Sequence, residues 1–418
     1  MPHRLNNPAQ GSNLQQQGFY GLGIAPKILD ILESIKFKNP TPIQLKAIPL
    51  AIQGKDIIGI AQTGTGKTHS FAIPMVQLLA QKRGIGLVLA PTRELAIQID
   101  EAFKILCRGF GMQTACLIGG APMGAQVQAL RRNPRIVIAT PGRLIDHIEQ
   151  HNILLHFVSM LVLDEADRML DMGFAPQIQQ IMRYLPKEKQ TMLFSATIPQ
   201  AILEMAAKNM KLPVSIEVAP SGSTAERVTQ ELFIVKKENK TQLLGRLLAQ
   251  YKGSVLLFSR TKHYAKKLAR SIRDMGYSAA EIHSNRSLSQ RREALDGFKS
   301  GKYRVLVATD IAARGIDVTA IELVINYDLP EDAENYVHRI GRTARAGQKG
   351  HAISFASPEQ SIEVKNIEKL IRANLPISKH PQFASEGFIQ GSHQQAPSRP
   401  QRNFRPHFKQ KHNRFHRH

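Results

Sequence analysis

A glycine-rich loop between an apolar run and a helical stretch constrains this chain more than any other feature of its sequence. The apolar run is Asp56–Ala61, and the loop that follows reads Gln62-Thr63-Gly64-Thr65-Gly66-Lys67-Thr68. Backbone N–H groups of such a loop surround phosphate oxygens. Further along the chain, the apolar run Leu161-Val162-Leu163 ends in the acids Asp164-Glu165. Together the two motifs predict a nucleoside triphosphate site within an α/β fold.

The polar residues of the two motifs have separate chemical roles. Lys67 adds a point charge for the phosphates, and Thr68 offers its hydroxyl to Mg²⁺. Asp164 is expected to hold the same Mg²⁺ through water, and Glu165 is expected to activate the attacking water as a general base. Ala61 stands where the general pattern has its first glycine, so the loop is one variant of that pattern. The alternative, a glycine-rich turn without a ligand, is disfavoured by the downstream acids.

Length and composition narrow the class of protein. The 418 residues suffice for two or three domains, and 42% hydrophobic with 21% charged residues is typical of a soluble protein. No apolar run approaches the about 20 residues of a membrane-spanning helix, and Met1–Gln17 lacks the apolar core of a signal peptide. The only cysteines, Cys107 and Cys116, indicate a reducing, cytoplasmic compartment and two small buried side chains.

The charge balance points to a polyanionic partner. The net charge is +23, and the basic stretch Gly387–His418, which contains no acidic residue, accounts for less than half of it. A basic excess that extends over the folded part favours nucleic acid as the partner. The alternative is that the charge serves only solubility.

Alternating strand-like and helical segments predict two parallel α/β units. Strands of the first unit are expected at Asp56–Ala61, Gly86–Ala90, Ala115–Ile118, Ile136–Ala139, Met160–Leu163 and Thr191–Phe194. Strands of the second are expected at Ser254–Phe258, Ala279–Ile282, Tyr303–Ala308, Leu323–Asn326 and Ala352–Phe355, with an amphipathic helix at Lys262–Met275. The expected division is a flexible N-terminus at 1–18, domains at 19–211 and 229–377, a linker at 212–228, and a disordered basic tail at 378–418.

The predicted tail mixes Arg and Lys with Phe404, Phe408 and Phe415. Cations with scattered aromatic rings can hold RNA loosely and with strong salt dependence. A purely solubilising role is the alternative. The tail histidines are interpreted as adventitious metal binders at most.

The motifs, taken in order, are similar to those of DEAD-box RNA helicases, over roughly residues 18–372. The family name corresponds to Asp164-Glu165-Ala166-Asp167. Further first-domain motifs that resemble the family are Phe37-Lys38-Asn39-Pro40-Thr41-Pro42-Ile43-Gln44, Pro91-Thr92-Arg93-Glu94-Leu95, Gly119-Gly120, Thr140-Pro141-Gly142-Arg143 and Ser195-Ala196-Thr197. Those of the second domain are Leu257-Phe258-Ser259-Arg260-Thr261, Ala308–Asp317 and His338–Arg345. The resemblance implies two tandem RecA-like domains. The motif sequences of the second domain are most similar to those of the bacterial RhlE-type branch.

On the nucleotide side, the resemblance implies ATP as cofactor. A glutamine amide both donates and accepts, so Gln44 is expected to read the adenine edge, with Phe37 stacked on the ring and Phe19 behind it. The alternative for both phenylalanines is a place in the core. Asp317 is expected at the ribose, and Arg342 and Arg345 are expected to be arginine fingers from the second domain. The alternative for the arginines is a solvated basic helix face.

On the nucleic-acid side, the resemblance implies contacts to the RNA backbone without sequence reading. The expected contacts are Pro91, Thr92, Arg93, Gly120, Thr140, Arg143, Arg260 and Thr309. Asp167 with Ser195, Ala196 and Thr197 is expected to couple hydrolysis to strand separation. Two departures from the family pattern are Lys36, where glycine is frequent, and Leu288, where a glutamine precedes Arg291 by three positions.

The sequence therefore predicts an ATP-dependent RNA helicase with local, non-processive unwinding. ATP and Mg²⁺ are the expected cofactors, RNA is the expected substrate, and ribosome-assembly or RNA-degradation machinery is the expected partner. Two alternatives are an RNA clamp that uses ATP only to time its release, and a DNA helicase. The Gln44 motif and the Asp-Glu-Ala-Asp spelling disfavour DNA.

Overall fold

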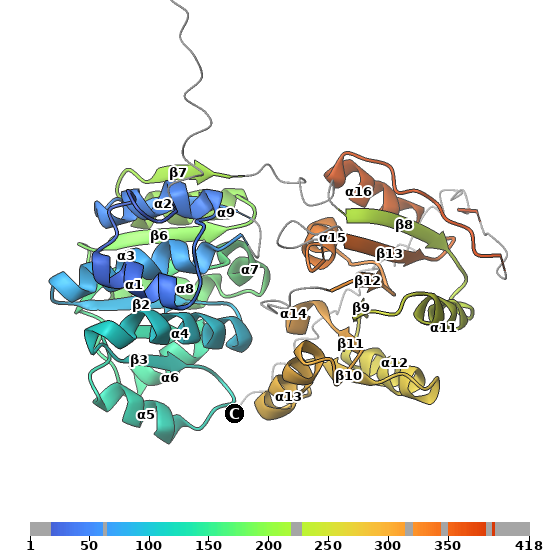
Figure 1. Ribbon diagram of the computed structural model, residues 1–418, viewed down its shortest axis with the longest axis horizontal. Helices are drawn as coiled ribbons and strands as arrows, with labels where there is room; N and C mark the ends of the chain where they lie inside the picture. The colour runs from blue at the N-terminus through green and yellow to red at the C-terminus, as the bar shows by residue number, and fades with distance from the viewer. Residues whose placement is uncertain are drawn as a thin grey trace, which may run out of the picture.

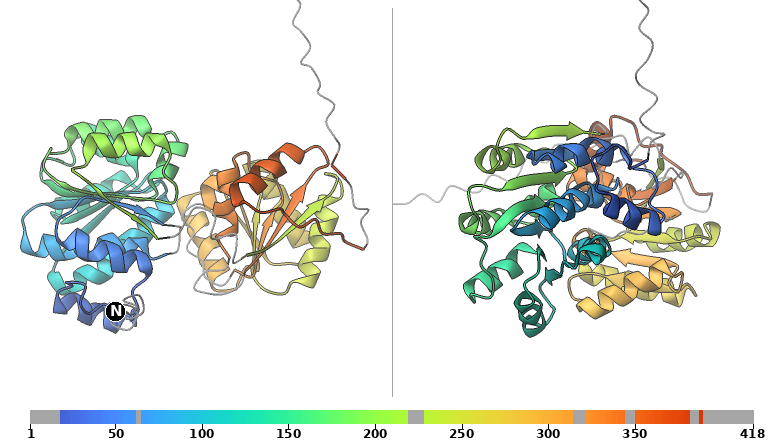
Figure 2. Two further views of the ribbon diagram at one scale, coloured as in Figure 1. Left: turned by 90° about the horizontal axis from the view of Figure 1, so that it is seen from above. Right: turned by 60° about the vertical axis from the view of Figure 1, so that its left-hand side comes forward.

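Two α/β units stand side by side in the computed structural model, which describes residues 18–61, 65–218, 228–313, 321–343, 350–381 and 387–388 (Figure 1). Within these residues the first unit has a seven-stranded sheet in the order β3-β4-β2-β5-β6-β1-β7. The second has a six-stranded sheet in the order β10-β11-β9-β12-β13-β8. Helices cover both faces of each sheet, as the further views also show (Figure 2). The predicted pair of tandem parallel α/β domains is confirmed.

The first unit follows the expected order of strands and helices. Its strands are β1 (Ile57–Ile60), β2 (Ile85–Leu89), β3 (Thr114–Leu117), β4 (Ile136–Ala139), β5 (Val158–Leu163), β6 (Gln190–Ser195) and β7 (Val214–Glu217). Its α-helices are α1 (Pro26–Ser34), α2 (Pro42–Ile52), α3 (Lys67–Gln81), α4 (Arg93–Cys107), α5 (Met123–Arg131), α6 (Pro141–Glu149), α7 (Ala166–Asp171), α8 (Ala175–Tyr184) and α9 (Gln200–Asn209).

The second unit repeats the alternation on a smaller scale. Its strands are β8 (Val228–Ile234), β9 (Val255–Phe258), β10 (Ala279–Ile282), β11 (Val305–Ala308), β12 (Leu323–Asn326) and β13 (Gly350–Ala356). Its helices are α11 (Lys240–Gln250), α12 (Lys262–Asp274), α13 (Leu288–Lys299), α14 (Asp310–Ala313), α15 (Ala333–Ile340) and α16 (Ser361–Ile371).

The sequence did not reveal two strands, and both lie at the edge of a sheet. β7 falls inside the predicted linker and pairs in parallel with β1, with Ile57 opposite Val214. β8 begins at Val228 and pairs with β13. Edge strands need less burial, so their sequences carry polar residues and lack the continuous apolar run of a central parallel strand. Every residue of the central strands β4 and β11 is buried.

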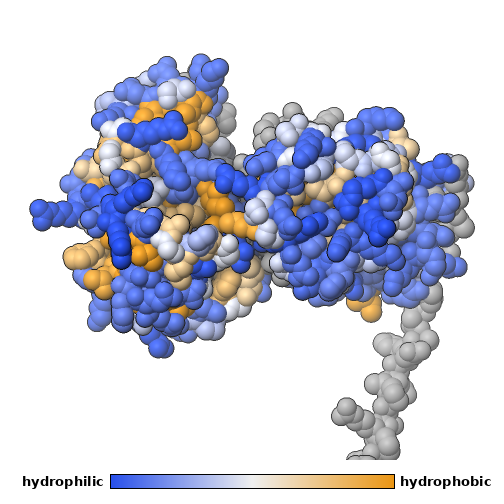
Figure 3. Space-filling view, turned by 90° about the horizontal axis from the view of Figure 1, so that it is seen from below, coloured by the Kyte–Doolittle hydropathy of each residue, from blue (hydrophilic) through white to orange (hydrophobic). Residues whose placement is uncertain are grey.

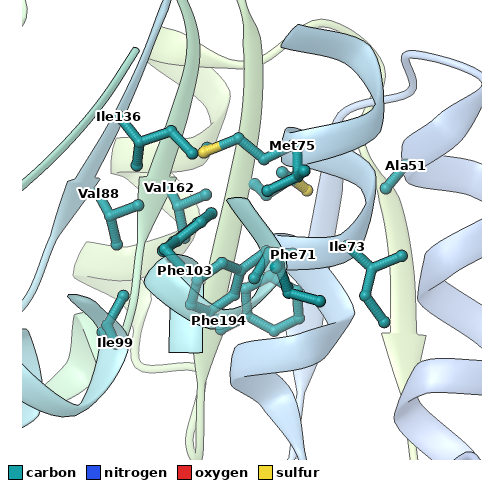
Figure 4. Close-up of a cluster of buried hydrophobic side chains, with 14 of the residues drawn as sticks. Ala51, Phe71, Ile73, Met75, Val88, Ile99, Phe103, Ile136, Val162 and Phe194 are labelled. Atoms are coloured by element: carbon teal, nitrogen blue, oxygen red, sulfur yellow. The ribbon is translucent and has the colours of Figure 1, made fainter. Parts of the chain in front are cut away.

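An aromatic cluster fixes the helix that follows the phosphate loop. Phe71 of α3 packs against Phe194 of β6, with ring centroids 5.4 Å apart, and against Phe103 of α4 at 6.2 Å (Figure 4). All three rings are fully buried. Burying such a side chain contributes roughly 1.5–3 kcal/mol to stability. The start of α3 is therefore held rigidly against the strands that carry the acidic motif and Ser195.

The second unit continues to the predicted start of the tail. The Leu232 N–H donates to the Pro376 carbonyl, and the Ser378 N–H donates to the Leu232 carbonyl, each at 2.8 Å. Phe388 also packs against the second hydrophobic core, which places part of the predicted disordered tail on the folded unit. Most of that tail lies outside the described residues. Among the described helices, none combines the length and apolar character that crossing a bilayer requires.

Both cysteines are expected to resist alkylation in the folded protein. Cys107 is buried as predicted, whereas Cys116 is only partly buried. Burial raises the pKa of both thiols to about 12, and the charge of Asp100 adds to the effect. Because the thiolate is the nucleophile, iodoacetamide at pH 7 should label them at least about 100-fold more slowly than after unfolding. Mass spectrometry of the time course checks this. Labelling of the native protein at the rate of a free thiol would show that these side chains are accessible.

Candidate nucleotide and nucleic-acid site

The phosphate loop leads directly into α3. Gly66 has φ +89°, and α3 begins at Lys67. A Cβ on Gly66 would collide with Gln44 and Thr41, so both the turn and its packing require glycine. The Lys67 side chain is buried, and its Nζ makes no hydrogen bond to any described residue. A buried ammonium group of this kind fits an anion such as a phosphate. Gln62, Thr63 and Gly64 lie outside the described residues.

The acidic motif lies close to this loop because of the order of the strands. Asp164 and Glu165 follow β5, and only β6 separates β5 from β1, which precedes the loop. Both acids are almost fully buried. Glu165 has φ +51°, a left-handed conformation that is costly for a residue with a side chain, and its N–H donates to Asp164 Oδ1 at 3.0 Å. The backbone therefore holds the two carboxylates in one defined arrangement.

Three cations determine the ionisation of Glu165. Burial alone would raise its pKa, but Arg168, Lys67 and Arg342 together lower it below the ordinary value. Arg168 Nη1 lies 2.9 Å from Glu165 Oε2, and this ion pair is buried. Burial raises the pKa of Asp164 to about 6, although the charge of Lys67 opposes that shift. Glu165 is thus an ionised carboxylate that can accept a proton.

One of these cations comes from the second unit. Arg342 follows α15, is 3% exposed, and donates from Nε to the His338 carbonyl at 3.3 Å. Together with His338 and Arg339 it borders a small cleft against Arg168 of the first unit. The structure therefore brings together Glu165, Lys67 and one of the two predicted arginine fingers. The other, Arg345, lies outside the described residues, as does Asp317.

Two arginines that sequence reasoning did not select support this arrangement. Arg168 directly follows the acidic motif and pairs with Glu165. Arg339 is buried and forms a two-pronged ion pair with Asp310, with Nε–Oδ1 at 2.6 Å and Nη2–Oδ2 at 2.7 Å. Its guanidinium also lies 5.0 Å from the centre of the Phe258 ring. Arg339 thereby fixes the end of α15, which Arg342 follows. A single arginine within a basic motif gives no sequence signal of burial.

The predicted coupling residues are in direct contact. Asp167 Oδ2 accepts from the N–H groups of Ala196 and Thr197, both at 3.0 Å, and from Thr197 Oγ1 at 3.3 Å. The Asp167 N–H donates to Ser195 Oγ at 3.2 Å. Ser195 ends β6, and its carbonyl accepts from Ala61 N–H at 3.0 Å. The network thus joins the acidic motif, β6 and the first residue of the phosphate loop.

The predicted adenine residues lie beside the loop. Phe37 stacks on Phe19 with centroids 5.3 Å apart, and Phe19 is also part of the core. His69 of α3, which sequence reasoning did not select, lies 4.6 Å from the Phe37 ring. Lys36, where the family often has glycine, adopts φ +59°, the conformation that glycine favours.

Gln44 is more buried than its predicted role suggests. Its side chain is 0% exposed, its Oε1 accepts from Thr41 N–H at 2.9 Å, and its Nε2 donates to the Gly66 carbonyl at 2.9 Å. These two bonds use one of the two N–H donors and one of the two acceptor positions of the amide group. The structure therefore places Gln44 against the phosphate loop, and its contact with adenine stays a prediction.

The predicted RNA contacts of the first unit share one edge of its sheet. They follow β2, β3 and β4 at the carboxyl ends of these adjacent strands: Pro91, Thr92, Arg93, Gly120, Thr140 and Arg143. Gly120 has φ +78°, and a Cβ there would collide with the Arg93 guanidinium. Arg143 Nη1 donates to the Ala121 carbonyl at 3.3 Å. Gly120 is exposed and Arg93 and Arg143 are partly exposed, whereas Pro91, Thr92 and Thr140 are buried. Contact of these residues with a sugar–phosphate backbone stays a prediction.

The predicted RNA contacts of the second unit line a cavity at the boundary between the units. Arg260 follows β9 and Thr309 follows β11, and both border a cavity of about 410 Å³. Asp171 at the end of α7 contributes to the same cavity from the first unit. The domain boundary is therefore hollowed next to predicted RNA contacts.

A buried ion pair joins the units on this side. Arg291 Nη2 of α13 lies 2.9 Å from Glu94 Oε2 of α4, and both side chains are at most 10% exposed. Leu288, at the position where the family has glutamine, packs against the hydrophobic core of the first unit. An apolar contact thus stands where the family has a polar side chain.

Comparison with known proteins agrees with this geometry. Residues 41–205 match the family model of the DEAD/DEAH box helicase, and residues 239–347 match the helicase conserved C-terminal domain. The chain is 42% identical over 377 residues to an ATP-dependent rRNA helicase RRP3 of Debaryomyces hansenii, covering 89% of this chain and 79% of that protein. It is 39% identical over 397 residues to the DEAD-box ATP-dependent RNA helicase RhpA of Helicobacter pylori, covering 93% and 80%.

Solved structures show the same two-unit fold. S. cerevisiae Dbp5 bound to RNA and ADP BeF3 is similar with a TM-score of 0.78 at 30% identity, over 87% of this chain and 95% of that one. Both halves of the chain thus match their family models, and relatives match along most of its length. The chain belongs to the DEAD-box family of ATP-dependent RNA helicases.

Proposed function

We propose that this RNA helicase hydrolyses ATP in a site completed by its second unit, and that hydrolysis drives local, non-processive separation of RNA duplexes and remodelling of RNA–protein complexes. The observation that carries the proposal is the position of Arg342 of the second unit, which borders a cleft against Arg168, the ion-pair partner of Glu165 in the first unit, and helps to lower the pKa of Glu165. A site assembled from both units is complete only when they are closed. Binding of ATP and of RNA should therefore be coupled, each favouring the other.

The side chains divide the chemical work. Lys67 and Arg342 neutralise charge that develops on the transferred phosphoryl group. Glu165 orients a water molecule and accepts its proton as the water oxygen attacks the γ-phosphorus, while the bond to the leaving ADP oxygen breaks. The buried Arg168 holds the Glu165 carboxylate in place. Arg339 and Asp310 position the end of α15, directly before Arg342.

The residues present fit a magnesium ion. Thr68 supplies a hydroxyl beside the phosphate loop, and Asp164 supplies a buried carboxylate, both of which are hard oxygen donors of the kind that Mg²⁺ takes together with phosphate and water. When bound, the ion would neutralise phosphate oxygens. Thr68 and Asp164 are therefore the proposed magnesium ligands.

Substitution of Ser195 and Thr197 by alanine should separate hydrolysis from unwinding. The double variant removes the Ser195 and Thr197 hydroxyl contacts to Asp167 but retains the two backbone N–H donors to its carboxylate. The Thr197 hydroxyl donates to the Asp167 carboxylate, and a hydrogen bond to a charged group contributes about 1.5–3 kcal/mol, so displacement of a short RNA duplex should slow about 10- to 100-fold. RNA-stimulated ATPase activity should stay within about threefold of wild type, because Glu165 and Arg342 remain in place.

The same assay tests the proposed function against the clamp alternative. A wild-type protein that hydrolyses ATP in the presence of RNA but never separates strands would be an RNA clamp. Comparing ATPase stimulation by RNA and by DNA of equal length tests the DNA alternative, for which equal stimulation is the expected result.

The pair Glu94–Arg291 should stabilise the closed arrangement. Removing one partner of a buried pair leaves the other charge unpaired, so Glu94→Gln or Arg291→Gln alone should weaken RNA binding in the presence of an ATP analogue about 10-fold or more. The double variant should lose less than the sum of the two single variants. A double-mutant cycle on the RNA dissociation constant measures this coupling. Additive losses would show that the two side chains do not interact in the RNA-bound state.

The cellular role is proposed from the relatives. The Debaryomyces hansenii relative is named an rRNA helicase, which supports ribosomal RNA as a substrate and ribosome-assembly machinery as a partner. Association with RNA-degradation machinery, a cytoplasmic location and placement in the RhlE-type branch remain predictions from the sequence. RNA captured by crosslinking in cells, followed by sequencing, identifies the substrate.

A further inference from the structure

In the second sheet, the connections that leave β9 and its neighbour β12 run to opposite sides of the strand order. The chain leaves β9 through α12 towards β10 on one side of the sheet order, and leaves β12 through α15 towards β13 on the other side. In open parallel sheets, the crevice beyond the carboxyl ends of two such strands is where ligands bind. The phosphate loop lies in the first unit, so this crevice is a separate candidate for a ligand site.

A cavity of about 480 Å³ occupies this place. Its volume lies in the range of about 300–1,000 Å³ that small-molecule pockets have. Three cations and two tyrosines contribute to its lining: Lys237, Lys240, Arg260, Tyr264 and Tyr327. The carboxylates of Asp328 and Glu363 also contribute. Asp328 is engaged within the protein, because it lies 3.6 Å from Lys240 Nζ and accepts from Arg260 N–H at 3.1 Å.

The base of the cavity is built from fixed groups. Lys240 is 4% exposed, donates to the Tyr327 carbonyl at 2.9 Å, and lies 5.6 Å from the centre of the Tyr327 ring. The hydroxyl groups of Tyr327 and Tyr264 are 3.2 Å apart, and Thr241 Oγ1 lies 2.9 Å from Tyr327 Oη. These contacts hold the Tyr264 ring as part of a rigid wall. Lys237 and Arg260 are exposed and can approach a ligand from solvent.

The cavity continues the predicted RNA path. Arg260 borders both this cavity and the one at the domain boundary, where Thr309 also lies. α12, which carries Tyr264, is basic on its exposed side, with Lys266, Lys267 and Arg270. The underside of the second unit, where α12 and α13 lie in Figure 1, is covered largely by hydrophilic side chains (Figure 3). A polyanion held at Arg260 would therefore meet further positive charge in this direction.

We propose that this cavity binds an unpaired RNA nucleotide next to those held between the two units. Lys237 and Arg260 contact its phosphate, and its base stacks on the Tyr264 ring. Stacking on an aromatic ring is tolerant of sequence, because every base presents a π-face. The proposal rests on the RNA path of the proposed function, and adds a nucleotide to the length of strand that the protein holds.

Two single variants and two matched controls test the cavity. Lys237→Glu reverses a charge at the cavity, and Tyr264→Ala removes the stacking ring. Lys252→Glu makes the same charge reversal on an exposed lysine that precedes β9, at the opposite edge of the sheet, and Tyr264→Phe keeps the ring. Affinity is measured with single-stranded RNAs of about 6 and about 16 nucleotides, in the presence of an ATP analogue.

The two cavity variants should weaken binding of the longer RNA about tenfold, with the shorter RNA and its stimulation of ATPase activity unchanged. Lys252→Glu and Tyr264→Phe should match wild type with both RNAs. RNA that contains 4-thiouridine should crosslink to the peptide that includes Tyr264, and only with the longer RNA. Equal effects on both RNAs, or equal effects of Lys237→Glu and Lys252→Glu, would overturn the proposal. Failure of the short RNA to stimulate the wild-type enzyme would instead contradict the proposed function.

Discussion

Replacing Glu165 by glutamine is expected to lower the rate of RNA-stimulated ATP hydrolysis about 100- to 10,000-fold, the range for loss of a general base. The amide keeps the size of the side chain and can still accept a hydrogen bond from Arg168, which lies 2.9 Å from the carboxylate. It cannot take up a proton from water. ATP and RNA binding should persist, since Lys67 and the RNA contacts are unchanged, so the variant should accumulate in an ATP- and RNA-bound state.

Single-turnover hydrolysis and RNA affinity, measured on the same preparation, separate the two effects. Glu188→Gln makes the same chemical change on an exposed carboxylate that pairs with Lys211, and should leave both quantities at wild-type values. Turnover of Glu165→Gln within about twofold of wild type would remove Glu165 as the base. Loss of ATP binding would assign it a structural role instead.

The second large effect is expected for Arg342→Gln. An arginine that stabilises the transferring phosphoryl group contributes about 10³- to 10⁵-fold to turnover, so the RNA-stimulated rate should fall by that order. Lysine at this position should rescue only part of the loss, because a point charge lacks the forked geometry of guanidinium. RNA binding in the absence of nucleotide should remain, because Arg342 lies near Glu165 and is not one of the predicted RNA contacts.

The pH dependence supplies a further test of this contact. Arg342 contributes to the lowered pKa of Glu165, so its removal should raise that pKa. A base with a higher pKa becomes protonated sooner as the pH falls, and the acidic limb of the rate profile of Arg342→Gln should move to higher pH. Arg246→Gln, on an exposed position of α11, is the matched control. An unshifted acidic limb together with wild-type turnover would show that Arg342 does not act at Glu165.

How far the sequence reveals the site depends on whether a residue acts through a local pattern. Lys67, Asp164 and Ser195 each belong to a short motif next to an apolar run, and the structure brings these motifs together at neighbouring strand ends. Arg168 and Arg339 carry no such signal, because the sequence of a basic or acidic motif does not show whether an arginine within it is buried or exposed. Their burial depends on partners brought near by the fold.

The same distinction explains the strands and the departures from the family pattern. Central parallel strands are buried on both faces and give continuous apolar runs, whereas the edge strand β7 gives a polar, Pro-flanked segment that resembles a linker. Lys36 stands where the family often has glycine. Its left-handed conformation can be read only from the backbone of the structure, because lysine gives no sequence signal for it.

By itself, the sequence determined the chemistry of this protein: a phosphate loop, two acids, a basic body and the order of strands that carry them. Local residue type and apolar periodicity suffice for such features. Only the tertiary structure decided which distant charges meet, namely Arg342 near Glu165, Arg291 at Glu94, and Lys237 and Arg260 around one cavity. These contacts depend on which strands are neighbours in each sheet and on how the two units pack. The spacing of residues along the chain determines neither.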